Sequence, residues 1–149
     1  MGRDDLREGS LIAGMLPFEF TVEGPPVSQQ TRRRERLPPW REAVRAAAKD
    51  LWAAESPSLD QELALTITYF YEGAPTDVDN IVKPILDSIK GLIYRDDVQI
   101  TDLISRRRPL AGPFRVEVVS PVLAEALAKG REFLHIHITD PPTEGALAF

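Results

Sequence analysis

The chain has 149 residues, of which 43% are hydrophobic and 28% are charged, and its formal net charge is −5. These proportions are typical of one globular domain and argue against wholesale disorder. The sequence has no apolar run near the roughly 20 residues of a membrane helix and no pattern of a secretory signal, so we expect a cytoplasmic protein without a membrane partner. The absence of cysteine excludes disulfides, thiolate zinc sites and cysteine nucleophiles.

Basic residues are unevenly distributed along this acidic chain, whose pI is about 5.1. Between Arg32 and Lys49 there are seven basic residues and two acidic ones, and a second basic run occupies residues 106–108. Because a phosphate backbone responds to a local basic patch, the acidic total does not exclude nucleic acid as a partner. A solvated loop and a charged strand end that prevents edge pairing are the alternative explanations of the two runs.

The first half of the chain predicts two strands separated by a helix. Residues 16–24 alternate apolar and polar side chains and predict a strand, and residues 25–39 form a loop rich in proline and arginine. Residues 39–54 have the spacing of an amphipathic helix. Residues 62–71 carry β-branched and aromatic side chains on both faces, which predicts a central strand.

The second half of the chain predicts two helices and three strands: helices over 79–90 and 121–130, and strands over 98–107, 114–120 and 132–139. The resulting order, β-α-β-α-β-β-α-β, predicts an α+β fold with a single domain, in which helices pack on one mixed β-sheet. We place this domain at residues 15–139, between a flexible leader (1–14) and a C-terminal tail (140–149).

Acidic residues bracket the predicted helix 79–90. Asp77 or Asp79 can cap its first turn, and Asp96 and Asp97 follow its end. Taken separately, a helix cap and a turn are the commoner explanations of such residues. The helix also has an apolar stripe that we expect to be buried, made of Ile81, Val82, Ile85, Leu86 and Ile89.

Chain lengths allow the two acidic ends to meet. A helix over 79–90 is ~18 Å long, and residues 92–97 span ~20 Å when extended. If the chain doubles back after the helix, Asp97 returns close to Asp77 and Asp79. The alternative is that Asp97 reaches the site of a partner subunit.

A cluster of three carboxylates predicts a metal site, because the carboxylates repel one another unless a cation lies among them. Oxygen ligands on a cysteine-free chain favour Mg²⁺, or else Mn²⁺. Such ions catalyse the hydrolysis of phosphodiesters, and Lys83 can neutralise the charge that develops on the phosphate or the leaving oxygen. Asp77, Asp79 and Asp97, together with Lys83, therefore have the composition expected for metal-assisted hydrolysis of a phosphodiester.

The stretch TDVDNIVKPILDSIKGLIYRDDVQI resembles the central motif of the RusA family of Holliday-junction resolvases. The family pattern is Asp-x-Asp-Asn-x-x-Lys, then an Asp in the helix, then Asp-Asp-x-Gln. The matching residues here are Asp77, Asp79, Asn80, Lys83, Asp87, Asp96, Asp97 and Gln99. GPPVSQQ, at residues 24–30, resembles the N-terminal Pro-Pro-Ser loop of the family more weakly. The resemblance covers roughly residues 16–139.

This resemblance implies a homodimeric, Mg²⁺-dependent endonuclease that makes paired, symmetric nicks in branched DNA, most notably four-way junctions, during recombination and repair. It implies that the three aspartates named above are the metal-binding acids and that Lys83 is the essential basic group. It gives supporting roles to Asn80, Asp87 and Asp96. With a nuclease site in the chain, we expect phosphate contacts from the two basic runs: Arg32, Arg33, Arg34, Arg36, Arg106 and Arg107.

Two alternatives remain beside junction resolution. One is a nuclease with the same site that acts on flaps, forks or RNA. The other is a DNA-binding or inhibitory module that keeps the fold without catalysis, and the presence of every acid and of the lysine argues against it. His135 and His137 share one face of the last predicted strand. They could bind a metal, although a packed or exposed pair is the commoner outcome.

Overall fold

Residues 16–143 are described by the structure, which is a computed structural model. The predicted leader and residues 144–149 of the predicted tail lie outside this range. The elements, in chain order, are β1 (Phe18–Glu23), η1 (Arg34–Arg36), α2 (Leu37–Leu51), β2 (Leu63–Tyr71), α3 (Val82–Ile89), η2 (Asp97–Gln99), β3 (Ile100–Pro109), α4 (Pro121–Lys129) and β4 (Phe133–Thr139). Within residues 16–143, no helix has the length and apolar character needed to cross a membrane.

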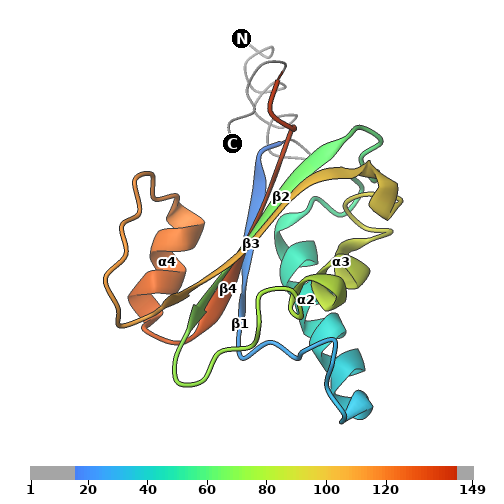
Figure 1. The fold of residues 1–149 in the computed structure, drawn as a ribbon. Helices are drawn as coiled ribbons and strands as arrows, with labels where there is room; N and C mark the ends of the chain where they lie inside the picture. Colours follow the sequence, from blue (N-terminus) through green and yellow to red (C-terminus); the bar gives the residue numbers. More distant parts are fainter. Residues whose placement is uncertain (1–15, 144–149) are drawn as a thin grey trace.

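The four strands form one sheet in the order β1-β4-β2-β3 (Figure 1). Strand β4 pairs antiparallel with both β1 and β2, whereas β2 and β3 are parallel. This mixed sheet with its helices confirms the predicted α+β fold. Strand β2 is an inner strand and is buried along most of its length, as its apolar sequence predicted.

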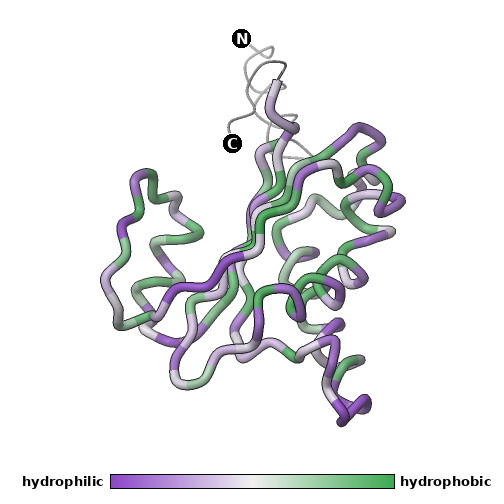
Figure 2. The backbone as a smooth tube through the Cα atoms, viewed as in Figure 1, coloured by the Kyte–Doolittle hydropathy of each residue, from purple (hydrophilic) through white to green (hydrophobic). Residues whose placement is uncertain are grey.

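Helices cover both faces of this sheet: α2 and α3 lie on one face, and α4 lies on the other (Figure 1). The larger core fills the space between the sheet and α2 and α3, and it includes Phe20, Trp40 and Tyr94. A smaller cluster around Phe70 and Phe133 lies under α4. Figure 2 shows apolar segments within the sheet and a hydrophilic stretch along the second half of β3, which carries the arginine run.

The parallel pair β2 and β3 requires a crossover connection, and this connection carries the acidic motif. Parallel neighbours cannot be joined by a tight hairpin, so the chain leaves the end of β2, passes through α3 and returns to the start of β3. Residues 72–99 form this connection and contain all the aspartates of the motif. The crossover therefore positions the candidate site beside α3.

Helix α3 begins at Val82 rather than at residue 79, and it ends at Ile89. The predicted caps are wrong, because no side chain accepts a hydrogen bond at its first turn. Instead, the backbone N–H of Asn80 donates to the carbonyl oxygen of Asp77 (3.0 Å) in a turn that precedes the helix. The carboxylates of Asp77 and Asp79 are thus not used as caps. The predicted buried stripe is confirmed at Ile81, Ile85, Leu86 and Ile89, whereas Val82 is half-buried.

The strand predicted over residues 114–120 is wrong. After β3, a turn closed by a hydrogen bond from the N–H of Gly112 to the carbonyl oxygen of Pro109 (3.0 Å) directs the chain away from the sheet. Phe114 then packs against Phe70, with 5.2 Å between the ring centroids. Packing of this aromatic side chain under α4 takes the place of strand pairing, so the segment forms a wall over the sheet.

Candidate active site

The loop between β2 and α3 places Asp77 and Asp79 beside the second half of β3. The hydroxyl of Ser105 donates to the carbonyl oxygen of Val78 (2.6 Å), which attaches the loop to the strand. The guanidinium of Arg107 lies 3.6 Å from the carboxylate of Asp77. Asp79 is exposed and has no ion pair with another residue of the described range.

After α3 the chain turns back and brings Asp97 to the first turn of the helix. The ammonium of Lys83 lies 3.6 Å from Asp97 and 3.0 Å from Asp87. The buried hydroxyl of Tyr94 lies 2.8 Å from Asp97 and 3.1 Å from the carbonyl oxygen of Leu86. The second half of the motif therefore meets the first half within one chain, at Lys83.

The turn that carries Asp97 is held by the two motif residues on either side of it. The carboxylate of Asp96 accepts a hydrogen bond from the N–H of Val98 (3.2 Å), and the side-chain oxygen of Gln99 accepts from the N–H of Asp96 (3.0 Å). The amide of Gln99 also donates to the carbonyl oxygen of Leu59 (2.8 Å). This reciprocal capping box fixes the start of η2, and an acid followed by glutamine three residues later was its signal in the sequence.

The electrostatics of the site keep Lys83 and Tyr94 protonated at neutral pH. The hydrogen bond and the charge of Asp87, with a smaller contribution from Asp97, raise the pKa of Lys83. Burial and then the hydrogen bond to Asp97 raise the pKa of the Tyr94 hydroxyl well above its usual range. Lys83 is thus a fixed positive charge and not a base, and Tyr94 remains a hydrogen-bond donor to Asp97.

Cationic side chains contact two of the three predicted metal-binding acids. Within residues 16–143, no three carboxylate or imidazole groups lie close enough together to hold a metal ion. Lys83 contacts Asp97, and Arg107 contacts Asp77. The donor chemistry nevertheless fits a hard cation, because Asp77, Asp79 and Asp97 offer carboxylate oxygens. The side chain of Asp77 is 74% exposed and that of Asp97 is 35% exposed, so both are accessible to an ion.

The first basic run lies close to the acidic motif. The first four arginines of this run, Arg32, Arg33, Arg34 and Arg36, are all exposed. The guanidinium of Arg34 donates to the carbonyl oxygen of Gln29 (2.6 Å). The N–H of Gln29 donates in turn to the carbonyl oxygen of Asn80 (2.8 Å). The loop 24–30 therefore connects the arginines to the motif.

The second basic run is divided between the two faces of the sheet. Successive side chains of a strand point to opposite faces. Accordingly, Arg107 contacts Asp77 on the face of α2 and α3, while Arg106 donates to the hydroxyl of Thr68 (3.0 Å) and lines a cavity beside α4. The two neighbouring arginines therefore have partners on different faces of the sheet.

Sequence reasoning missed three residues that hold the site. Tyr94 orients Asp97, and Ser105 attaches the loop that bears Asp77. Arg41, on α2, lies 4.0 Å from Asp87. The only sequence signal for Tyr94 is its position three residues before Asp97. Ser105 and Arg41 lie outside the motif and have no such signal. Their roles depend on tertiary packing.

A comparison with protein families finds that the model described as endodeoxyribonuclease RusA matches residues 23–119. The matched range includes the loop 24–30 and the whole connection from β2 to β3. A comparison with curated proteins finds no match.

Proposed function

Because the chain belongs to the RusA family of endodeoxyribonucleases, we propose that it resolves four-way DNA junctions by metal-dependent hydrolysis, acting as a homodimer. The observation that most supports this proposal is the contact of Lys83 with Asp97 (3.6 Å). This contact brings the two halves of the acidic motif together without a partner chain. A two-fold dimer would present two equivalent sites to a two-fold junction, which requires two nicks.

In this proposal Asp77, Asp79 and Asp97 would supply the carboxylate oxygens that hold Mg²⁺, or Mn²⁺ in its place, once their side chains move closer together than they lie in this structure. When bound, the ion activates a water molecule and stabilises the charge on the scissile phosphate and the departing oxygen. Lys83 keeps its proton and supplies a second positive charge to the same phosphate. Arg107 lies 3.6 Å from Asp77, so it would have to give up this contact if Asp77 held a metal ion, and its guanidinium would then be available to a phosphate.

Asn80, Asp87 and Asp96 support these groups. Asp87 holds the ammonium of Lys83 at 3.0 Å, and Asp96 caps the turn that bears Asp97. The carbonyl oxygen of Asn80 accepts the N–H of Gln29 and thereby joins the basic loop to the site. We place the first four arginines of the first basic run, Arg32, Arg33, Arg34 and Arg36, against the phosphates of the junction, where they position the duplex arms without reading the base sequence.

The proposal is tested by incubating the purified protein with a synthetic four-way junction, a linear duplex and a flap of related sequence. Each substrate is tested with Mg²⁺, with Mn²⁺ and with a chelator at fixed salt. We expect paired, symmetric nicks on the junction alone and no cleavage with the chelator. Cleavage of the flap in preference to the junction would overturn the assigned substrate. A lack of metal-dependent cleavage on all three substrates would overturn the assigned activity.

Replacement of Tyr94 by phenylalanine tests the orientation of Asp97. The change removes only the hydroxyl that lies 2.8 Å from Asp97. Since loss of a residue that orients a metal ligand costs about 10- to 100-fold, we expect junction cleavage to fall by that factor and the Mg²⁺ concentration for half-maximal rate to rise. Rates are measured across Mg²⁺ concentrations, with Tyr71→Phe as the matched control. An unchanged dependence on Mg²⁺ would show that Tyr94 does not orient a ligand.

A further inference from the structure

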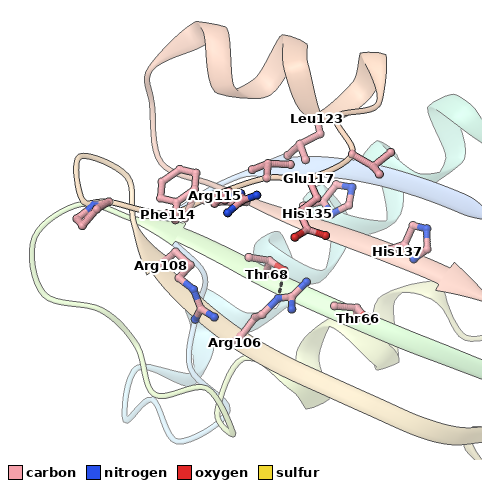
Figure 3. Close-up of a pocket in the computed structure, with 14 residues that line it drawn as sticks. Thr66, Thr68, Arg106, Arg108, Phe114, Arg115, Glu117, Leu123, His135 and His137 are labelled. Carbon is pink, nitrogen blue, oxygen red and sulfur yellow. Dashed lines mark hydrogen bonds between the residues drawn. The ribbon is translucent and has the colours of Figure 1, made fainter. Parts of the chain in front are cut away.

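A cavity of about 540 Å³ lies on the face of the sheet that α4 covers (Figure 3). Its floor is formed by β2, β3 and β4, and its opposite wall is the segment 113–118 that leaves the sheet after β3. Leu123 of α4 closes one side. Side chains of α3 do not line this cavity, which is therefore separate from the acidic motif. Its volume is in the range of small-molecule sites.

Three arginines without a carboxylate partner line this cavity. Arg106 and Arg108 come from alternate positions of β3, and Arg115 comes from the opposite wall (Figure 3). None of the three makes an ion pair with a residue of the range 16–143, whereas Arg107 and Arg131 each contact an acid. Glu117 also lines the cavity, so three guanidinium groups face one carboxylate and the lining keeps an excess of positive charge. Such an excess favours the binding of an anion, and the planar guanidinium donors match the oxygens of a phosphate.

A neighbouring hydroxyl orients Arg106, and two histidines add further polar groups to the cavity. The hydroxyl of Thr68 accepts a hydrogen bond from Nε of Arg106 (3.0 Å), which leaves the terminal nitrogens of Arg106 for a ligand. His135 lies 2.8 Å from the carboxylate of Glu19. Burial, followed by the charge of His135, lowers the pKa of His137. A neutral imidazole still offers one N–H to an acceptor.

The other end of the cavity is aromatic. Phe70 and Phe114 line it, with ring centroids 5.2 Å apart, and Phe114 is half-buried. An accessible ring of this kind is a surface on which an unpaired base can stack, and such stacking is tolerant of base identity. The cavity thus combines a cationic end with an aromatic end.

We propose that this cavity binds one nucleotide with an unpaired base. Its phosphate lies against Arg106 and Arg115, and its base lies against Phe114. The nucleotide is either a free monophosphate or part of a single strand of DNA, and the two sources share the same phosphate and base chemistry. This site goes beyond the proposed function, and binding at it does not require cleavage.

The test is calorimetric titration of the full chain at one fixed salt concentration, because phosphate binding depends on salt. The probes are thymidine monophosphate, inorganic phosphate and an oligothymidylate of eight nucleotides. We expect the monophosphate, the oligonucleotide or both to bind at least about tenfold more tightly than phosphate. Loss of one charged hydrogen bond corresponds to about tenfold or more in affinity, so Arg106→Gln and Arg115→Gln are expected to weaken binding by that factor.

The matched control is Arg131→Gln, which removes the same charge from an exposed position outside the cavity. We expect its affinity to stay within about twofold of the unmodified protein, because isolated surface charges contribute little. The two nucleotide probes identify the source of the ligand. Binding of the monophosphate indicates a free nucleotide, and binding of the oligonucleotide alone indicates a DNA strand. The thermal unfolding midpoint of each variant verifies that it is folded.

Three outcomes would overturn the nucleotide site: no binding of the monophosphate or the oligonucleotide, phosphate binding as tight as that of the nucleotide, or an equal loss in all three arginine variants. The variant Phe114→Leu adds an independent readout. We expect it to reduce the preference for nucleotide over phosphate while phosphate binding persists, and an unchanged preference would overturn the stacking assignment. Junction cleavage is assayed separately, so its failure leaves this result interpretable.

Discussion

Replacing Asp79 by asparagine is expected to reduce junction cleavage by at least about 10³-fold, because the substitution removes a ligand charge that stabilises the transition state. Asp79 is exposed and has no ion pair with another residue of the range 16–143. The substitution is therefore expected to change the free energy of unfolding by no more than about 0.5 kcal/mol. A loss of cleavage in this variant reports on chemistry and not on folding.

DNA binding should survive in the same variant. Asparagine removes one negative charge near the phosphates, so affinity for the junction is expected to persist or to rise. Cleavage is measured with Mg²⁺, and binding is measured by gel retardation with a chelator. Asp50→Asn is the matched control, since Asp50 is an exposed aspartate on α2, outside the motif. Cleavage by Asp79→Asn at the rate of the control would refute the catalytic assignment of Asp79.

Substitution of Lys83 by methionine is expected to lower the rate of cleavage by about 10²-fold or more, which is the typical effect of removing one charge that stabilises the transition state. The ammonium lies between Asp87 and Asp97, and no metal ligand is removed. We therefore expect the loss in the rate at saturating Mg²⁺, with metal affinity unchanged or increased. Lys49→Met is the matched control, because Lys49 is an exposed lysine of α2.

The pH dependence separates a fixed charge from a base. Asp87 and Asp97 raise the pKa of Lys83 above its ordinary value of 10.5, so the side chain is protonated on both sides of neutrality. Between pH 7 and 9 the ratio of the rates of the unmodified protein and Lys83→Met is therefore expected to be constant. A ratio that changed about tenfold per pH unit in this range would indicate that Lys83 titrates during catalysis and would contradict the proposed role.

Local patterns were sufficient to predict most of the fold. The apolar stripe of α3 and the two-faced apolar character of β2 depend on periods of 3.6 and 2 residues, which can be counted in the sequence. The same approach failed at residues 114–120. An alternation of apolar and polar residues is expected for a strand, but also for an irregular segment that packs on one side. Phe114 packs under α4, and no local signal distinguishes this packing from strand pairing.

The candidate site was predictable where it depends on chain length and not where it depends on packing. Helix and strand rises were enough to predict that the chain returns after α3, where Asp97 contacts Lys83. The predicted cluster of Asp77, Asp79 and Asp97 is not formed, because within residues 16–143 no three acids lie close enough together to hold a metal ion. The start of α3 was wrong, since a backbone turn at Asp77 precedes the helix. The partner of each basic residue also depends on which face of the sheet is covered, and that is a tertiary property.

Because the arginine run lies on strand β3, the number of residues between Asp97 and the run decides which face of the sheet each arginine reaches. Arg106 and Arg107 serve opposite faces because they are neighbours on one strand. A single-residue insertion between Asp97 and this run would exchange the two side chains, unless a β-bulge absorbed it. Insertions and deletions here are therefore compatible with both faces only in pairs, or where a bulge absorbs a single residue, as the register shift opposite Leu63 and Ala64 already does near the start of β3.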